Sequence, residues 1–326
     1  MAGLERNILK NVMIAYAITN GEIIPHIRNR LVQRVRMKSP SFDYGVICKK
    51  GSHSKMDNGR ESIYNKYELL RLYSVLEKIE NEVGDAINAQ KNPKGNVDYR
   101  NVLSYSLGKS LVDMREIIIL CAEGMPDGAL SIARNIFEQF VIVEYLNSRL
   151  DKDSFDLLLE KYQDDYVVKR AKALIFYETE IGNSNERKVN HENELKKIKM
   201  RYNIKSLNQY WWSGCNTFSE LCNVVSKEID CSVKNFFRFM EFIYRRASLS
   251  IHSSYMGNIM RLGSDSFNIE MGPWITGQEV PLFLGTASLI LIAGYTYNYL
   301  ELNYTSVKEE LNDLCTIYKE MINRKM

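Results

Sequence analysis

The segment Val280–Leu300 has the sequence VPLFLGTASLILIAGYTYNYL, without one charged side chain. It is long enough to cross a bilayer as a helix. Pro281 and Asn298 lie within it, however, and Glu279 and Glu301 flank it where Lys or Arg commonly anchors the cytoplasmic end of a span. We therefore expect a buried central helix, and a membrane span is the alternative.

Apolar residues recur at helical spacing along much of the remaining chain. In Arg60–Gln90 the pattern includes Tyr64, Tyr67, Leu76 and Val83. The other predicted helices are Val102–Cys121, Ala129–Leu150, Phe155–Ile181, Asn185–Tyr202, a shorter one that runs through Leu221, Val233–Ser253, Val280–Tyr304 and Ser306–Asn323. A turn is expected at residues 123–128, and Ser306 with Glu309 is expected to cap the last helix.

Strand patterns are sparse and are confined to Phe42–Cys48 and Arg261–Met271. The predicted fold class is therefore all-α, a multi-helix bundle with small irregular or hairpin segments near residues 42–55 and 261–274. Residues 1–58 are expected to form a basic N-terminal arm or subdomain, and residues 59–326 the helical-bundle domain.

The composition is that of a soluble globular protein, with 45% hydrophobic and 25% charged residues among 326. A net charge of +3 does not by itself indicate a nucleic-acid binder. The six Cys form no Cys-x-x-Cys pair and there are only four His, so we expect neither a metal site nor a cofactor. The first residues lack the pattern of a signal peptide, and the expected location is the cytoplasm, without membrane contact.

The most distinctive polar residues are Glu241, Arg245, Ser248 and His252, which fall on one side of the predicted helix Val233–Ser253. A His exchanges protons near neutral pH, and a guanidinium stabilises a charged phosphate. Together they suffice for metal-free RNA cleavage, because the 2′-hydroxyl is an internal nucleophile. The alternative is structural: Glu241 and Arg245 form an ordinary helix pair and His252 packs at the helix end.

A second pair, Arg134 and Glu138, shares a helix face with Ser131 among apolar neighbours. A structural ion pair that orients two helices is the favoured interpretation. The alternative is that the pair braces the site on the helix that carries His252.

Three blocks resemble a bacterial family of all-α domains of unknown function. They are Gly128–Glu138, Trp212–Leu221 and Tyr244–Ser254. Their order and spacing carry the similarity, which extends over roughly residues 60–305.

The third block also resembles the signature of the HEPN superfamily, an Arg and a His separated by four to six residues. Both Arg245 and Arg246 fit that spacing to His252. HEPN nucleases commonly have a polar residue after the Arg; Arg246 is followed by Ala247, so Arg245 fits better. The resemblance implies a metal-independent endoribonuclease that acts as a homodimer, in which His252 works with one of the two Arg residues.

The predicted function is thus a HEPN-type endoribonuclease, an abortive-infection or toxin effector with an antitoxin or defence-system partner. Ser248 would orient the site, with support from Arg134, Glu138, Glu241 and Tyr244. RNA would follow a basic segment that consists of Arg28, Arg30, Arg34, Arg36 and Lys38, unless that segment is a solvated helix face. The alternative function is a non-catalytic helical module for ligand sensing or protein interaction.

Overall fold

The computed structural model describes residues 61–89, 97–182, 184–229, 231–251 and 277–323, all within one compact unit, Asn58–Met326. Every regular element in these ranges is a helix, so the predicted all-α multi-helix bundle is confirmed. Both strand candidates, the irregular segments near 42–55 and 261–274 and the predicted N-terminal arm lie outside the described residues.

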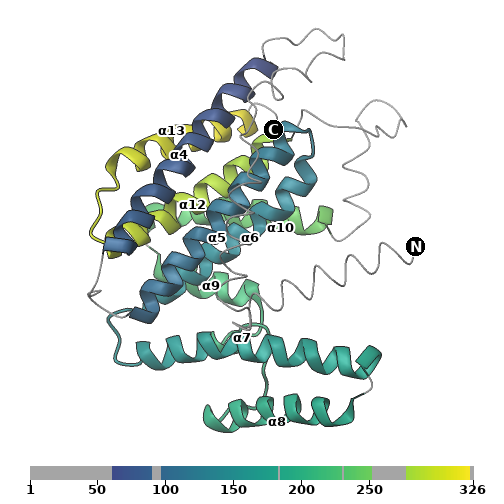
Figure 1. The fold of residues 1–326 in the computed structure, drawn as a ribbon. Helices are drawn as coiled ribbons and strands as arrows, with labels where there is room; N and C mark the ends of the chain where they lie inside the picture. Colours follow the sequence, from purple (N-terminus) through teal and green to yellow (C-terminus); the bar gives the residue numbers. More distant parts are fainter. Residues whose placement is uncertain (1–60, 90–96, 183, 230, 252–276, 324–326) are drawn as a thin grey trace. The chain divides into compact units, whose positions relative to one another are not determined.

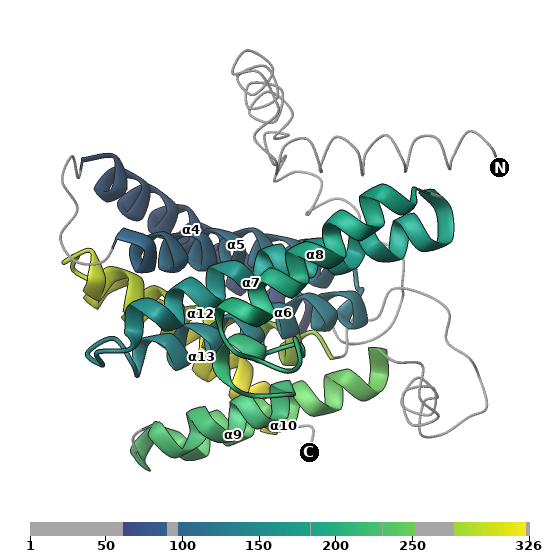
Figure 2. The ribbon, with the colours of Figure 1, turned by 90° about the horizontal axis from the view of Figure 1, so that it is seen from below.

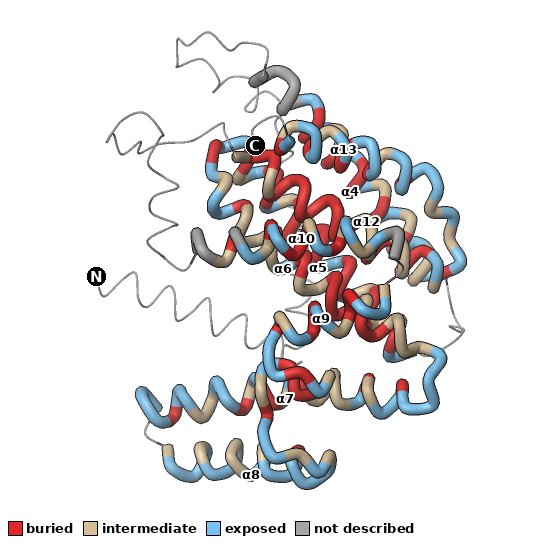
Figure 3. Tube along the Cα trace, turned by 180° about the vertical axis from the view of Figure 1, so that it is seen from behind, coloured by how far each residue is buried: buried red, intermediate tan, exposed pale blue. Residues whose placement is uncertain are grey.

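Helix α12 (Glu279–Tyr299) packs against α5 (Val97–Ala122), α6 (Pro126–Asn147) and α13 (Thr305–Asn323), as Figure 1 shows. By length and composition α12 could cross a membrane, but 78% of its most apolar window is buried inside the protein. The uncharged segment is therefore the buried central helix that the sequence predicts, and it supplies a large share of the core (Figure 3).

Close packing between α5 and α12 depends on Gly285. A Cβ atom at this position would lie 2.6 Å from Met114 Sδ and 3.1 Å from Ile117 Cδ1. Real Cβ contacts are not that short, so the missing side chain is what lets α5 approach α12.

The end of α12 differs from the prediction. The expected helix continued to Tyr304, but α12 ends at Tyr299. Glu301 has a φ of 57°, in the left-handed region, and the Leu302 N–H turns back to the Tyr297 carbonyl at 2.9 Å. A left-handed residue just after the last turn stops a helix, and spacing of apolar residues does not reveal it.

The predicted role of Ser306 as a helix cap is wrong, because α13 already begins at Thr305. The Asn303 carboxamide oxygen accepts a hydrogen bond from the Thr305 N–H at 3.0 Å. The Ser306 hydroxyl instead accepts one from Lys78 of α4 (Glu61–Ala89) at 3.0 Å, which links the two outer helices.

Two other helices start earlier than expected. Helix α5 begins at Val97 instead of Val102, and α6 begins at Pro126, inside the predicted turn. Pro suits the first helical position, because its ring fixes φ and its missing N–H has no helical partner to lose.

Helices α7 (Phe155–Tyr177) and α8 (Asn185–Arg201) form a hairpin through a π-helical turn, Glu178–Gly182 (Figure 2). Figure 3 shows that α8 is mostly exposed or half-buried. The Trp211 indole, in the short 3-10 helix Trp211–Ser213, donates to the buried Asp165 of α7 at 2.8 Å. This bond helps to attach the hairpin to the rest of the chain.

Helices α9 (Phe218–Glu228) and α10 (Cys231–Ile251) follow in sequence and pack on α6, and α10 also contacts α12. They lie together on one side of the bundle in Figure 2. The predicted helix Val233–Ser253 corresponds to α10. Its last two residues lie outside what the structure describes.

Candidate functional site

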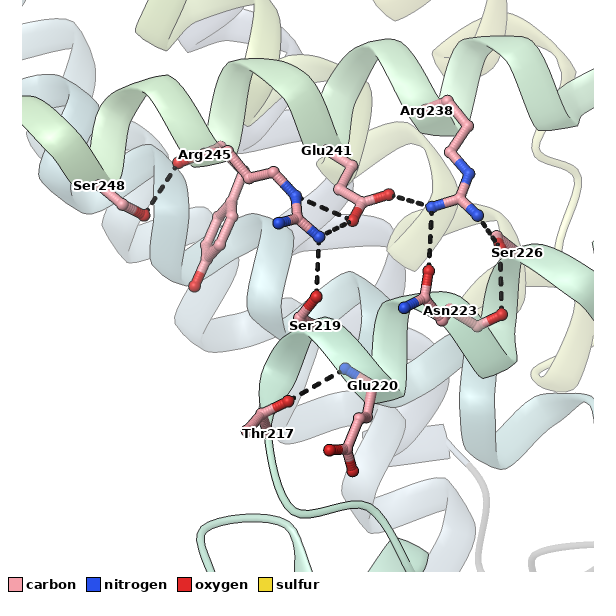
Figure 4. Close-up of polar contacts among 10 residues, drawn as sticks. Thr217, Ser219, Glu220, Asn223, Ser226, Arg238, Glu241, Arg245 and Ser248 are labelled. Atoms are coloured by element: carbon pink, nitrogen blue, oxygen red, sulfur yellow. Dashed lines mark hydrogen bonds and ion pairs between the residues drawn. The ribbon is translucent and has the colours of Figure 1, made fainter.

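The start of α9 is fixed by hydrogen bonds of its own sequence. The Thr217 hydroxyl accepts from the Glu220 N–H at 3.2 Å, and the Glu220 carboxylate accepts from the Asn216 N–H at 2.7 Å. Such bonds satisfy backbone donors that the first helical turn leaves open. They hold Ser219 on the first turn of α9, beside α10 (Figure 4).

The polar centre of α10 is Glu241, whose side chain is only 6% exposed. Arg238 Nη1 donates to its Oε2 at 2.5 Å, and Arg245 donates to its Oε1 from Nε at 3.1 Å and from Nη2 at 2.7 Å. Both carboxylate oxygens are thus bound by guanidinium groups at spacings of three and four residues. We call these residues the Arg238–Glu241–Arg245 cluster (Figure 4).

Polar side chains of α9 complete this cluster. Arg245 Nη2 also donates to Ser219 Oγ at 2.8 Å, and Arg238 donates to Ser226 Oγ at 2.7 Å and to Asn223 Oδ1 at 3.4 Å. The two arginines therefore join α9 to α10 at two places about two helical turns apart.

Electrostatics within the cluster follow from burial and charge. The hydrogen bond to Glu241 raises the pKa of Arg245. Burial raises the pKa of the Cys222 thiol, and the nearby Glu241 charge adds to that effect. Cys222 is thus a neutral buried thiol and not an activated nucleophile.

Arg245 has hydrogen-bond donors that the described residues do not use. Its side chain is 55% exposed, and its Nη1 makes no hydrogen bond with the part of the chain that the structure describes. Since the other two nitrogens fix its orientation, Nη1 can present two N–H groups to an oxyanion such as a phosphate. The Glu241 oxygens are occupied, so the cluster suits an anion better than a cation. Among the described residues, no group of three or more His, Cys, Asp or Glu could hold a metal ion.

Tyr244 connects α10 to the second predicted pair. Arg134 Nη2 donates to the Tyr244 hydroxyl at 3.2 Å, and this hydroxyl donates to Glu138 Oε1 at 2.7 Å. The Arg134 guanidinium also lies 4.8 Å from the centre of the Tyr244 ring. Burial raises the pKa of Tyr244, so the phenol stays protonated and keeps its donor role.

Aromatic rings fix Tyr244 in this position. Phe137 and Phe218 lie 5.3 Å and 4.8 Å from its ring centre. Arg134 and Glu138 are 3.7 Å apart, beyond hydrogen-bonding distance, so Tyr244 is their principal shared partner. The second pair therefore contacts α10 through Tyr244, the neighbour of Arg245 in sequence.

The remaining predicted site residues divide into two groups. The Ser248 hydroxyl donates to the Tyr244 carbonyl at 3.1 Å, within its own helix. The others lie outside the described part of the structure, and they are the Arg246 side chain, His252, Arg28, Arg30, Arg34, Arg36 and Lys38.

Four residues of the cluster and its α9 partners were not predicted from the sequence. Arg238 lies three residues before Glu241, and that spacing could have indicated it. The α9 residues Ser219, Asn223 and Ser226 carry no comparable signal, because their role depends on how α9 packs on α10.

Residues 100–269, more than half of the chain, match the model described as Family of unknown function (DUF5677). The chain belongs to this family. The match includes the Arg238–Glu241–Arg245 cluster, the pair of Arg134 and Glu138, and His252. It leaves out α4, α12 and α13. No curated protein and no solved structure matches the chain.

Proposed function

We propose that this protein is a metal-independent endoribonuclease of the HEPN type. The supporting observation is the Arg245 guanidinium, which Glu241 and Ser219 hold and which is half exposed. Its Nη1 carries two donors that no residue in the described part of the chain uses. It precedes His252 by seven residues. A guanidinium fixed before the substrate arrives needs little reorganisation to stabilise charge on a phosphate.

In this proposal His252 takes the proton of a ribose 2′-hydroxyl. The 2′-oxygen attacks the adjacent phosphorus, the bond from phosphorus to the 5′-oxygen breaks, and the 5′-oxygen takes a proton from water as it leaves. The products are a 2′,3′-cyclic phosphate and a 5′-hydroxyl end. Arg245 binds the non-bridging oxygens while their charge increases. Tyr244, held by Arg134 and Glu138, keeps the adjacent turn of α10 in place.

As an effector of defence or abortive infection, the enzyme acts as a homodimer and is restrained by an antitoxin or another defence-system partner. A gene for such a partner next to its own gene would support this role. The basic segment from Arg28 to Lys38 contributes phosphate contacts to RNA.

The test is cleavage of total RNA by the purified chain in EDTA. The wild type is expected to cleave, and His252→Ala is expected to lose cleavage with its circular dichroism unchanged. Arg245→Gln is expected to lower the rate by about 100-fold or more. Arg238→Gln is the matched control, because it removes the other guanidinium from the same carboxylate. Equal losses in both Arg variants contradict a specific role for Arg245.

A non-catalytic helical module is the second candidate, and one observation favours it. Glu241 uses both oxygens to bind Arg238 and Arg245, which join α9 to α10. If the cluster serves only this structural purpose, no RNA is cleaved and His252→Ala only lowers the melting temperature.

A further inference from the structure

One face of α5 carries a row of exposed apolar side chains. Tyr105, Val112 and Ile119 are 77%, 51% and 43% exposed and are spaced seven residues apart. Seven-residue spacing keeps side chains in line along two helices that cross at a shallow angle. This row, the α5 stripe, thus has the pattern of a helix that packs along another helix.

Gly108 lies between Tyr105 and Val112 on the same face. Among the described residues, nothing lies within 4 Å of a Cβ atom added to it. Glycine inside a helix is unfavourable compared with alanine. Contacts within the described part of the protomer therefore do not explain this glycine. A second helix that approaches α5 closely does explain it.

We propose that the α5 stripe is the interface of a homodimer in which α5 packs antiparallel on α5 of a second copy, with the twofold axis at Val112. In this arrangement Tyr105 of one protomer faces Ile119 of its partner, twice. Gly108 faces Glu116 and leaves room for that longer side chain. A surface that fits itself in this way meets the requirement of a twofold interface.

Charge complementarity favours a second copy as the occupant. The exposed Glu116 of one protomer comes next to Lys109 of its partner, once on each side of the axis. Lys109 binds Asp113 at 2.8 and 3.0 Å, but its side chain is 54% exposed and an ammonium has three donors. It can therefore bind the partner's carboxylate as well.

Helix α4 packs alongside α5 and limits the contact to the stripe itself. Arg115 of α5 binds Glu80 of α4 at 2.5 Å and lies over the Tyr73 ring, which fixes α4 alongside. Contacts along four turns of α5 alone make a small interface, so the dimer should dissociate on dilution.

The inference supplies an interface for the homodimer of the proposed function and rests on it in that respect. Sedimentation over a range of concentrations tests the interface by mass alone, so a failure to dimerise is distinguished from a failure to cleave RNA. The wild type is expected to shift from one chain to two as concentration rises. Val112→Asp is expected to stay monomeric at every concentration. Val189→Asp on α8 is the matched control, since Val189 is 50% exposed, and it should dimerise like the wild type.

Two further variants keep the test independent of folding defects. Val112→Cys, with Cys48 and Cys231 changed to Ser, should form a disulfide-linked dimer under mild oxidation, and Val189→Cys in the same background should not. Gly108→Leu should leave the monomer's melting temperature unchanged or higher but shift dimerisation to at least tenfold higher concentration. A wild type that stays monomeric, or dimers that persist in Val112→Asp, would overturn the proposal.

Discussion

Arg245 binds Glu241 through two hydrogen bonds to one carboxylate oxygen, from Nε at 3.1 Å and from Nη2 at 2.7 Å. The carboxylate is buried, whereas the guanidinium is half exposed. Glu241 is therefore the fixed member of the pair and Arg245 the member that can meet a ligand. This asymmetry determines which substitutions affect stability and which affect binding.

Glu241→Gln should destabilise the fold. The neutral amide weakens the bonds to Arg238 and Arg245, but both guanidinium groups stay partly hydrated. We expect a loss of about 2 kcal/mol in the free energy of unfolding, the range for hydrogen bonds to charged groups. Urea denaturation measures it. Arg71→Ala, which breaks a more exposed pair with Asp313, should cost less than about 1 kcal/mol. Equal losses would contradict a special role for the buried carboxylate.

Tyr244→Phe should weaken the attachment of α10 to α6. It removes the hydroxyl that accepts from Arg134 and donates to Glu138 but keeps the ring against Phe137. We expect a loss of about 1–2 kcal/mol in unfolding free energy, because two half-buried charged groups lose a partner.

Hydrogen exchange checks the location of this effect. Amides of α10 should exchange faster in Tyr244→Phe, and those of α4 should not. A change spread evenly over all helices would mean that Tyr244 does not act locally.

The sequence predicted pairs within one helix better than bonds between helices. A spacing of four residues predicts the Glu241–Arg245 pair. The same spacing places Arg134 and Glu138 on one face of their helix. The bonds to Ser219 and Ser226 arise only when α9 packs on α10, and the Tyr244 bridge only when α10 packs on α6. Periodicity cannot show either contact.

Helix ends were also beyond the sequence pattern. The uncharged segment predicted α12, because charge-free helices are stable only where other helices or lipid cover them. Its end at Tyr299 depends on the left-handed backbone of Glu301, and the start of α13 depends on Asn303. Neither depends on the spacing of apolar residues.

Glu144→Gln should change how stability varies with pH. Burial raises the pKa of Glu144, a nearby Glu228 charge raises it further, and the hydrogen bond from Tyr295 opposes this rise. Because the folded-state pKa exceeds the unfolded value of 4.5, the contribution of Glu144 to the free energy of unfolding is full below pH 4.5. This contribution is lost as pH rises through the folded-state pKa. Glutamine does not titrate, so the variant does not lose stability in this way.

Urea unfolding of the wild type and Glu144→Gln measures the difference in unfolding free energy. The measurements run from about pH 4 to about pH 8, which begins in the ordinary carboxyl range. The variant should gain stability relative to the wild type as pH rises. Glu180→Gln, at an exposed position, should show no such trend. A relative gain toward low pH would contradict the raised pKa.

Gly285→Ala and Gly84→Ala should have opposite effects on stability, although both place alanine in a helix. No residue that the structure describes lies within 4 Å of a new Cβ at Gly84, so the better helix propensity of alanine should stabilise the fold by about 0.5–1 kcal/mol. At Gly285 the new Cβ would overlap Met114 and press on Ile117, which should cost about 1–3 kcal/mol. Met114→Ala added to Gly285→Ala should cost less than the sum of the two single changes, because the smaller side chain makes room. Thermal unfolding of the four variants measures all these effects, and strict additivity would show that α5 and α12 do not meet at Gly285.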